Sequence, residues 1–244
     1  MNYHTINLFG YKIFVDSLNK INPKPNHRLV INTLNTHSYV VAKKDIKFKE
    51  ALLASDVLIP DGIGMVKAIK YLNQKIINRI TGYDLLIYSL NYLNKSNGKC
   101  FFMGSTNTVL ISIKKRIIRE YKNIEVGYYS PPFKSEFTNK DDKNIIDSIN
   151  KFRPDILFIG MTAPKQEKWV YLNKNNLDAK AICSIGAVFD YYAGTVNRPS
   201  LFWREKGFEW LVRFFKNPLK LWQRNLISMP IFIFDIIRYK NRIS

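Results

Sequence analysis

Residues 28–62 read RLVINTLNTHSYVVAKKDIKFKEALLASDVLIPDG, and this stretch decides the fold. Residues 28–33 are a short apolar run of the kind that forms a buried strand. Residues 38–55 carry apolar side chains at helical spacing, and 57–60 are a second apolar run, which a Pro-Asp-Gly turn ends. A strand, a helix and a second strand in this order predict a βαβ unit with parallel strands.

The same alternation continues along the chain. Further strands are predicted at 99–104, 124–130, 155–160 and 180–186, and helices at 63–73, 84–95, 106–121, 140–152 and 164–175. We expect Ser105 to cap one of these helices and Pro164 to occupy the first position of another. The pattern predicts an α/β fold, with a mostly parallel, doubly wound, Rossmann-like sheet and helices on both faces.

The charge of the chain is strongly unbalanced. Of 244 residues, 38 are Lys or Arg and 19 are Asp or Glu, which gives a formal net charge of +19. Such a charge favours an anionic partner, namely nucleic acid, an acidic membrane face or a phosphorylated substrate. No apolar run approaches the roughly 20 residues of a spanning helix, and the first residues lack the pattern of a signal peptide. The sequence therefore predicts a cytoplasmic protein without a membrane-spanning segment.

The composition changes after residue 197. Residues 198–244 hold ten Lys or Arg against three Asp or Glu, together with three of the four Trp residues. We therefore predict an α/β domain over 1–197 and a basic, aromatic helical appendage over 198–244, which Pro218 and Pro230 divide into short helices. An apolar stripe at three- and four-residue steps is formed by Phe208, Leu211, Phe215, Leu219, Trp222 and Leu226. This stripe could lie at a membrane interface or pack on the main sheet, and the pattern alone leaves both open. Both can also hold, because different faces of the helices could serve each.

Several common catalytic motifs are absent from the sequence. It has no dinucleotide-binding fingerprint, no P-loop and no nucleophile elbow. No two acidic residues are spaced i, i+2, which argues against a sugar transferase that holds its metal through an Asp-x-Asp pair. The histidines His4, His27 and His37 show no metal-ligand spacing, and Cys100 and Cys183 lie in apolar runs typical of reduced core residues. No metal site and no cofactor are predicted.

Polar residues follow the predicted strands, where parallel sheets bind their ligands. Thr33 and Asn35 either contact a ligand or cap the next helix. Asp61 is a general base, a turn residue or the N-cap of the helix that starts near Ile63. Gly104 ends a third strand, and Asp190 lies in the FDYYAG run after the last one.

Two further clusters are candidates for binding. The run RITGYD contains Arg79, Thr81 and Asp84, for which helix capping is the structural alternative. The run GMTAPKQEK (160–168) turns from a strand into a helix, whose N-terminus with Lys165 and Gln166 could bind phosphate. A loop with solvated charges would give the same pattern.

These motifs, in this order, resemble the WecG/TagA/CpsF family of bacterial glycosyltransferases (glycosyltransferase family 26). The matching segments are Thr33-Leu34-Asn35, Pro60-Asp61-Gly62-Ile63-Gly64, Arg79-Ile80-Thr81-Gly82-Tyr83-Asp84, Phe102-Met103-Gly104, Ala163-Pro164-Lys165-Gln166-Glu167, Gly186-Ala187-Val188-Phe189-Asp190 and Glu209-Trp210-Leu211-Val212-Arg213. The resemblance covers residues 30–225 and implies the sheet type called GT-E.

The resemblance implies an inverting, metal-independent transfer of a sugar from a UDP-sugar to an acceptor sugar on undecaprenyl diphosphate. The donor would carry N-acetylmannosamine, its uronic acid or a hexose, and the product would enter a cell-surface polysaccharide such as teichoic acid or O-antigen. A basic nucleic-acid-binding α/β protein is the alternative that the charge supports.

The resemblance also assigns roles to residues. Asp61 would be the catalytic base, with Thr33 and Arg213 also catalytic. The substrate-binding residues would be Asn35, Arg79, Gly104, Lys165, Gln166, Glu167, Asp190 and Arg224. The appendage would dock on the inner face of the membrane, and we expect Arg213 to reach the site only then. Away from the membrane its apolar surface would favour a homo-oligomer.

Overall fold

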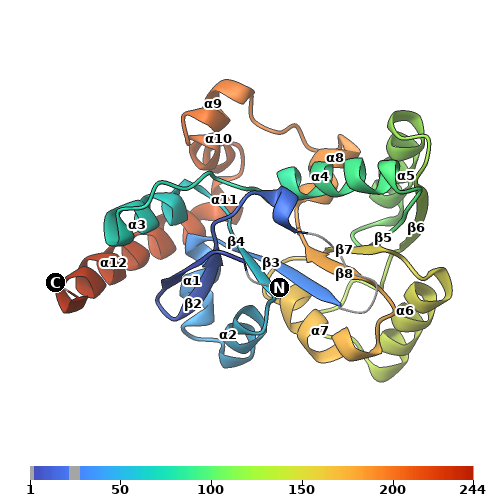
Figure 1. Ribbon diagram of the computed structural model, residues 1–244, viewed down its shortest axis with the longest axis horizontal. Coiled ribbons are helices and arrows are strands. Elements are labelled where there is room, and N and C mark those ends of the chain that lie inside the picture. The colour runs from blue at the N-terminus through green and yellow to red at the C-terminus, as the bar shows by residue number, and fades with distance from the viewer. Residues whose placement is uncertain (1–2, 22–27, 244) are drawn as a thin grey trace.

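A computed structural model describes residues 3–21 and 28–243 (Figure 1). Six strands form one parallel sheet in the order β4-β3-β8-β7-β5-β6. The strands are β3 (Leu29–Leu34), β4 (Val57–Pro60), β5 (Lys99–Gly104), β6 (Glu125–Tyr129), β7 (Ile156–Gly160) and β8 (Ala181–Ser184). The predicted α/β class and parallel sheet are confirmed.

Helices cover both faces of this sheet because successive strand residues point to opposite sides. One face packs against α4 (Gly82–Lys95), α5 (Asn107–Glu120) and α8 (Val188–Ala193), and the other against α2 (Ile46–Leu53), α6 (Asn139–Phe152) and α7 (Lys165–Asn173). In β5, for example, Phe102 faces the first layer and Phe101 the second. Two further helices, α1 (Thr36–Ala42) and α3 (Ile63–Asn73), lie at the β4 side, and η1 (Leu18–Lys20) and η2 (Lys174–Asn176) are single turns.

An antiparallel hairpin, which the sequence analysis did not predict, packs beside β4. It consists of β1 (Thr5–Leu8) and β2 (Tyr11–Phe14). Both turn residues, Phe9 and Gly10, have positive φ values of 56° and 87°, which is the pattern of a type I′ turn. The side chain of Asn7 accepts a hydrogen bond from the Gly10 N–H at 2.9 Å and stabilises this turn.

Three local predictions are wrong. The expected helix 38–55 is two helices, because Asp45 caps α2 by accepting from the Phe48 N–H at 3.0 Å. The cap of α5 is Thr106 and not Ser105; its hydroxyl accepts from the Val109 N–H at 3.4 Å. Pro164 is the N-cap of α7 and not its first residue, so this helix begins at Lys165.

The C-terminal segment is helical almost throughout. It contains α9 (Leu201–Glu205), α10 (Glu209–Lys216), α11 (Pro218–Trp222), the π-helix η3 (Gln223–Ser228) and α12 (Met229–Ile243). Pro218 begins a helix as expected, but Pro230 does not divide the segment. It lies in the first turn of α12, which continues directly from η3. Within residues 3–21 and 28–243, no helix is both long and apolar enough to cross a bilayer.

Residues 198–244 pack on the rest of the chain through α12, which Figure 1 shows beside α3. Phe232 is buried, with its ring centroid 5.4 Å from that of Tyr39. Asp235 accepts a hydrogen bond from the Tyr39 hydroxyl at 3.0 Å and pairs with Lys43 at 2.6 Å. The side chains of the apolar stripe do not share this packing. Exposed members are Phe208, Phe215, Leu219, Trp222 and Leu226, so the alternative that the stripe packs on the sheet is wrong.

Candidate functional site

Asp61 stands at the carboxyl end of β4, where the ends of β3 and β4 meet. Its backbone N–H donates to the carbonyl of Leu34 at 2.9 Å. The residue that caps α3 is Gly62, whose φ of 99° is a left-handed conformation, and no side chain caps this helix. The capping alternative for Asp61 is therefore wrong, and its carboxylate is left for the site.

Arginines from three parts of the chain surround this carboxylate. Burial raises the pKa of Asp61 above its ordinary value, and the positive charges of Arg224, Arg213 and Arg79 oppose that rise. The nearby carboxylate of Glu209 adds to it. Asp61 is thus a recessed acid that releases its proton at a higher pH than an ordinary aspartate. The neighbouring guanidinium groups stabilise its charged form.

Two of these arginines come from the appendage and lie close together. The guanidinium of Arg213, on α10, stacks over Tyr191 of α8 at 5.5 Å from the ring centroid. Burial and the charge of Arg213 lower the pKa of Arg224, while Asp61, Tyr191 and Glu209 oppose this effect. Paired guanidinium groups of this kind bind phosphate oxygens. Both arginines lie beside Asp61 in the single chain, so the expectation that Arg213 arrives only on membrane docking is wrong.

Glu209 joins the remaining arginines of the site. One carboxylate oxygen lies 3.6 Å from Nη1 of Arg79, and the other lies 3.9 Å from Nε of Arg198. Arg198 also donates to the hydroxyl of Thr81 at 3.3 Å and stacks over Tyr83 at 4.4 Å. The appendage therefore contributes both an acid and arginines to one cluster above β3 and β4.

The sequence analysis missed three members of this cluster, Tyr191, Arg198 and Glu209. Tyr191 and Glu209 lie next to or within quoted motifs, and Arg198 is the residue at which the composition changes. The sequence spacing of these three residues does not indicate that they lie near Asp61. The helices that bring them together are far apart in the sequence.

Other predicted residues serve as helix caps. The side-chain oxygen Oδ1 of Asn35 accepts from the N–H groups of His37 and Ser38, both at 3.0 Å, and so caps α1. Thr81 and Asp84 form a reciprocal capping box at the start of α4. The capping alternative is confirmed for these residues, and for Asn35 it leaves the amide nitrogen available to a ligand. Thr33, which is half-buried, pairs with Ile59 near the same sheet edge.

Lys165, Gln166 and Glu167 lie farther along the edge, at the start of α7. The ammonium of Lys165 donates to the carbonyl of Lys134 and lies 3.6 Å from the ring centroid of Phe137. Gln166 and Glu167 are buried, and the Gln166 amide donates to the Glu167 carboxylate at 2.8 Å. Burial raises the pKa of Glu167 to about 7.

Gly104 and Asp190 make backbone contacts near the carboxyl ends of the strands. Gly104 has a φ of 116°, and a Cβ there would lie 2.5 Å from the carbonyl oxygen of Gly160, so only glycine lets β5 and β7 approach this closely. Asp190 lies in the first turn of α8, and its carbonyl accepts from the N–H groups of Thr195 and Val196. The structure thus brings Arg79, Arg213 and Arg224 near enough to act on Asp61 by their charge, whereas Lys165, Gln166, Glu167, Gly104 and Asp190 make local contacts elsewhere along the edge.

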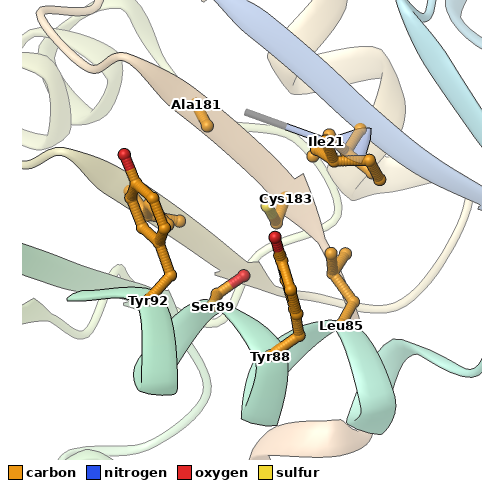
Figure 2. A pocket seen from close by; sticks show the side chains of 9 residues that line it. Ile21, Leu85, Tyr88, Ser89, Tyr92, Ala181 and Cys183 are labelled. Carbon is orange, nitrogen blue, oxygen red and sulfur yellow. The ribbon is translucent and has the colours of Figure 1, made fainter. Parts of the chain in front are cut away.

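A small hollow lies between α4 and the sheet, apart from Asp61 (Figure 2). It has room for about one water molecule, and no charged side chain lines it. Figure 2 shows Tyr88, Ser89 and Tyr92 on α4 beside Ala181 and Cys183 on β8. Since Ala181 begins β8, this hollow extends toward the amino ends of the strands, away from Asp61.

Two of the histidines and both cysteines can now be placed. Cys100 and Cys183 are buried free thiols, as predicted. His4 pairs with Asp16 at 2.8 Å on the surface, whereas His37 lies at the junction of α1 and η3. His27 lies outside the described residues.

Comparison with known proteins agrees with the resemblance seen in the sequence. A protein-family sequence model described as "Glycosyl transferase WecG/TagA/CpsF family" matches residues 5–244. Proteins of Staphylococcus aureus strains MW2 and MRSA252 are each 28% identical over 245 residues, covering 100% of this chain and 85% of theirs. Both are named N-acetylglucosaminyldiphosphoundecaprenol N-acetyl-beta-D-mannosaminyltransferase. Because the family model matches nearly the whole chain, this protein belongs to the WecG/TagA/CpsF family of glycosyl transferases.

Proposed function

We propose that this glycosyltransferase moves a sugar from a UDP-sugar to a hydroxyl of a sugar carried on a polyprenyl diphosphate. The observation that carries the proposal is the position of Asp61. It is a recessed carboxylate with no capping role, and Arg79, Arg213 and Arg224 surround it. A base and a set of phosphate-binding cations are the two groups that an inverting transfer requires.

In this mechanism Asp61 takes the proton of the acceptor hydroxyl. The acceptor oxygen forms a bond to the anomeric carbon while the bond from that carbon to the diphosphate oxygen breaks. One displacement inverts the configuration and releases UDP. Burial raises the pKa of Asp61, and a base with a raised pKa takes up the hydroxyl proton more readily. Thr33 and the amide of Asn35 lie at the same edge and would orient the acceptor.

The departing diphosphate gains negative charge, and the arginines would stabilise it. Guanidinium groups hold phosphate oxygens in bidentate fashion, and a recessed site strengthens this interaction. Across residues 3–21 and 28–243, no group of three or more His, Cys, Asp and Glu residues is placed to hold a metal ion. We therefore propose that Arg79, Arg213 and Arg224 supply the charge that other sugar transferases obtain from a metal.

The names of the relatives guide the choice of substrates. They specify an N-acetylglucosaminyl diphosphoundecaprenol acceptor and an N-acetylmannosaminyl group. UDP-N-acetylmannosamine is accordingly the first donor to test, followed by its uronic acid and by UDP-hexoses. The product would enter cell-surface polysaccharide biosynthesis.

The exposed stripe of the appendage supports action at a membrane surface. We propose that Phe208, Phe215, Leu219, Trp222 and Leu226 contact the cytoplasmic face of the bacterial membrane, where the lipid-linked acceptor lies. Basic residues of the same segment, Lys206 and Lys216 among them, are exposed and would attract anionic lipid. The same apolar surface would favour self-association away from the membrane.

UDP release tests the proposal. Wild type and Asp61→Asn would be incubated in detergent and EDTA with a diphospholipid-linked N-acetylglucosamine and each UDP-sugar in turn. We expect turnover with one donor in wild type and a loss of at least about a hundredfold in the variant. Turnover that is abolished by EDTA and restored by a divalent metal would contradict metal independence. A folded wild-type protein that neither binds UDP nor turns over any donor would overturn the proposed function.

A further inference from the structure

A hydrogen bond joins two residues that no part of the proposed mechanism uses. Nδ1 of His37 lies 2.8 Å from Oγ of Ser228, and 191 residues separate them along the chain. His37 is in the first turn of α1, and Ser228 is the last residue of the π-helix η3. Ser228 is only 3% exposed and His37 is half-buried, so this bond is partly shielded from water.

Ser228 fixes the helix turn that carries Arg224. The π-helix spans Gln223–Ser228, so Arg224 and Ser228 lie about one turn apart. Widened turns of this kind are uncommon and occur frequently at functional sites. A contact at Ser228 therefore bears on the rotation of η3 and on the direction of the Arg224 side chain.

His37 is in turn fixed relative to Asp61. Its backbone N–H donates to the side chain of Asn35, which directly follows β3. The last residue of β3, Leu34, accepts the backbone N–H of Asp61. A continuous series of bonds therefore leads from Asp61 through Leu34, Asn35 and His37 to the helix of Arg224.

We propose that His37 is a positioning residue, which holds η3 through Ser228 so that Arg224 faces Asp61 and the diphosphate of the donor. The inference rests on the proposed function, because it assumes that Arg224 binds the donor. It adds a residue that contacts neither substrate but sets the affinity of the site.

The charges around His37 agree with a neutral imidazole. Burial and the charge of Arg224 on η3 lower the pKa of His37. Arg224 in turn faces Asp61 from β4, Arg213 and Glu209 from α10 and Tyr191 from α8. On the far side of α1, Asp235 of α12 is already occupied by Tyr39 and Lys43. A proton on His37 would place a second positive charge beside Arg224 and would disfavour the observed arrangement.

Calorimetric titration with UDP tests the proposal on the full chain. Loss of one partly shielded hydrogen bond should weaken binding about fivefold to tenfold in His37→Ala and in Ser228→Ala. The double variant should be no weaker than either single variant, because both remove the same bond. His37→Asn, which keeps a polar atom near the position of Nδ1, should restore most of the affinity. His4→Ala, which changes an exposed histidine at the hairpin, should bind UDP as wild type does.

A pH series tests whether His37 acts in its neutral form. Because the pKa of His37 lies below its ordinary 6.5, wild type and His37→Asn should depend on pH in the same way between pH 7.5 and 6.5. Unchanged UDP affinity in both His37→Ala and Ser228→Ala would overturn the positioning role. Arg224→Ala separates the two proposals. If wild type and this variant bind UDP equally well, Arg224 has no role in donor binding and the inference about His37 fails. If wild type binds no UDP, the proposed function itself is refuted.

Discussion

The carboxylate of Glu209 lies 3.6 Å from the guanidinium of Arg79, and this contact joins the appendage to the edge of the sheet. Glu209 begins α10, whereas Arg79 precedes α4, and both side chains are largely buried. The second oxygen of Glu209 faces Arg198. One acid thus orients two arginines of the candidate donor site.

Glu209→Gln should weaken donor binding even though it removes a negative charge from an anion site. The two arginines would lose their common partner, and breaking a partly buried pair costs more than the roughly 1 kcal/mol of a surface pair. We expect kcat/KM for the donor to fall about tenfold, with Glu205→Gln, an exposed acid on α9, as the matched control. A variant that binds UDP more tightly than wild type would show that Glu209 acts only by repulsion.

The activity should depend on pH through Asp61. Because burial raises the pKa of this carboxyl, the base loses its charge at a higher pH than an ordinary Asp does, and the acid limb of kcat/KM should lie above pH 3.8. Arg224 opposes this rise, so Arg224→Ala should move the limb to a still higher pH. The measurement is kcat/KM across pH 4 to 8. If the acid limb does not move in the variant, Arg224 does not influence the pKa of Asp61.

Glu167→Gln should change how stability depends on pH. The folded protein holds the proton of Glu167 up to about pH 7, while the unfolded chain releases it near the ordinary 4.5. Stability therefore falls as the pH rises from about 4.5 to about 7, by roughly 3 kcal/mol in total. Glutamine cannot ionise and still accepts from Gln166, so the variant should be more stable than wild type at pH 8 and similar at pH 4.5. Urea unfolding at both values tests this, with the exposed Glu50→Gln as control.

Gly104→Ala should destabilise the fold by more than about 2 kcal/mol, because the new Cβ meets the Gly160 carbonyl at 2.5 Å in a left-handed backbone. Gly194→Ala is the matched control, since its φ is 77° and nothing lies within 4 Å of the added Cβ. It should cost only the strain of a left-handed backbone at a non-glycine residue, about 1–2 kcal/mol. If urea unfolding shows the same loss of stability in both variants, the close approach of β5 to β7 is not the reason that residue 104 must be glycine.

Membrane binding should depend on the stripe and not on exposed apolar residues in general. Phe215 and Leu219 are 73% and 92% exposed, and inserting such side chains into lipid contributes about 1.5–3 kcal/mol each. The double variant Phe215→Ser, Leu219→Ser should lose more than tenfold in binding to phosphatidylglycerol vesicles, measured by sedimentation. Leu172→Ser on α7, at a position 71% exposed, is the control and should bind as wild type does. Equal losses in the two proteins would contradict a docking surface on the appendage.

The strands were predictable because each is a short apolar run that the parallel sheet buries on both faces, as in KCFFMG and ILFIG. The hairpin β1–β2 was not predicted because its four-residue strands lack such a run, and its turn depends on the left-handed conformation of Phe9. Caps such as Asp45 and Thr106 compete with neighbouring polar residues, so the exact starts of helices were less certain than their existence.

The sequence by itself determined the α/β class, the order of strands and helices, the edge at which polar residues gather and the resemblance to the family, because these depend on local patterns along the chain. Only the tertiary structure decided that Asp61 does not cap a helix and that Arg79, Arg213 and Arg224 surround it. It also decided that the stripe is exposed while Phe232 is buried. The reason is physical: these properties depend on how η3 and α12 fold back onto α1, through contacts such as His37 with Ser228, and residues so far apart leave no periodic signal in the sequence.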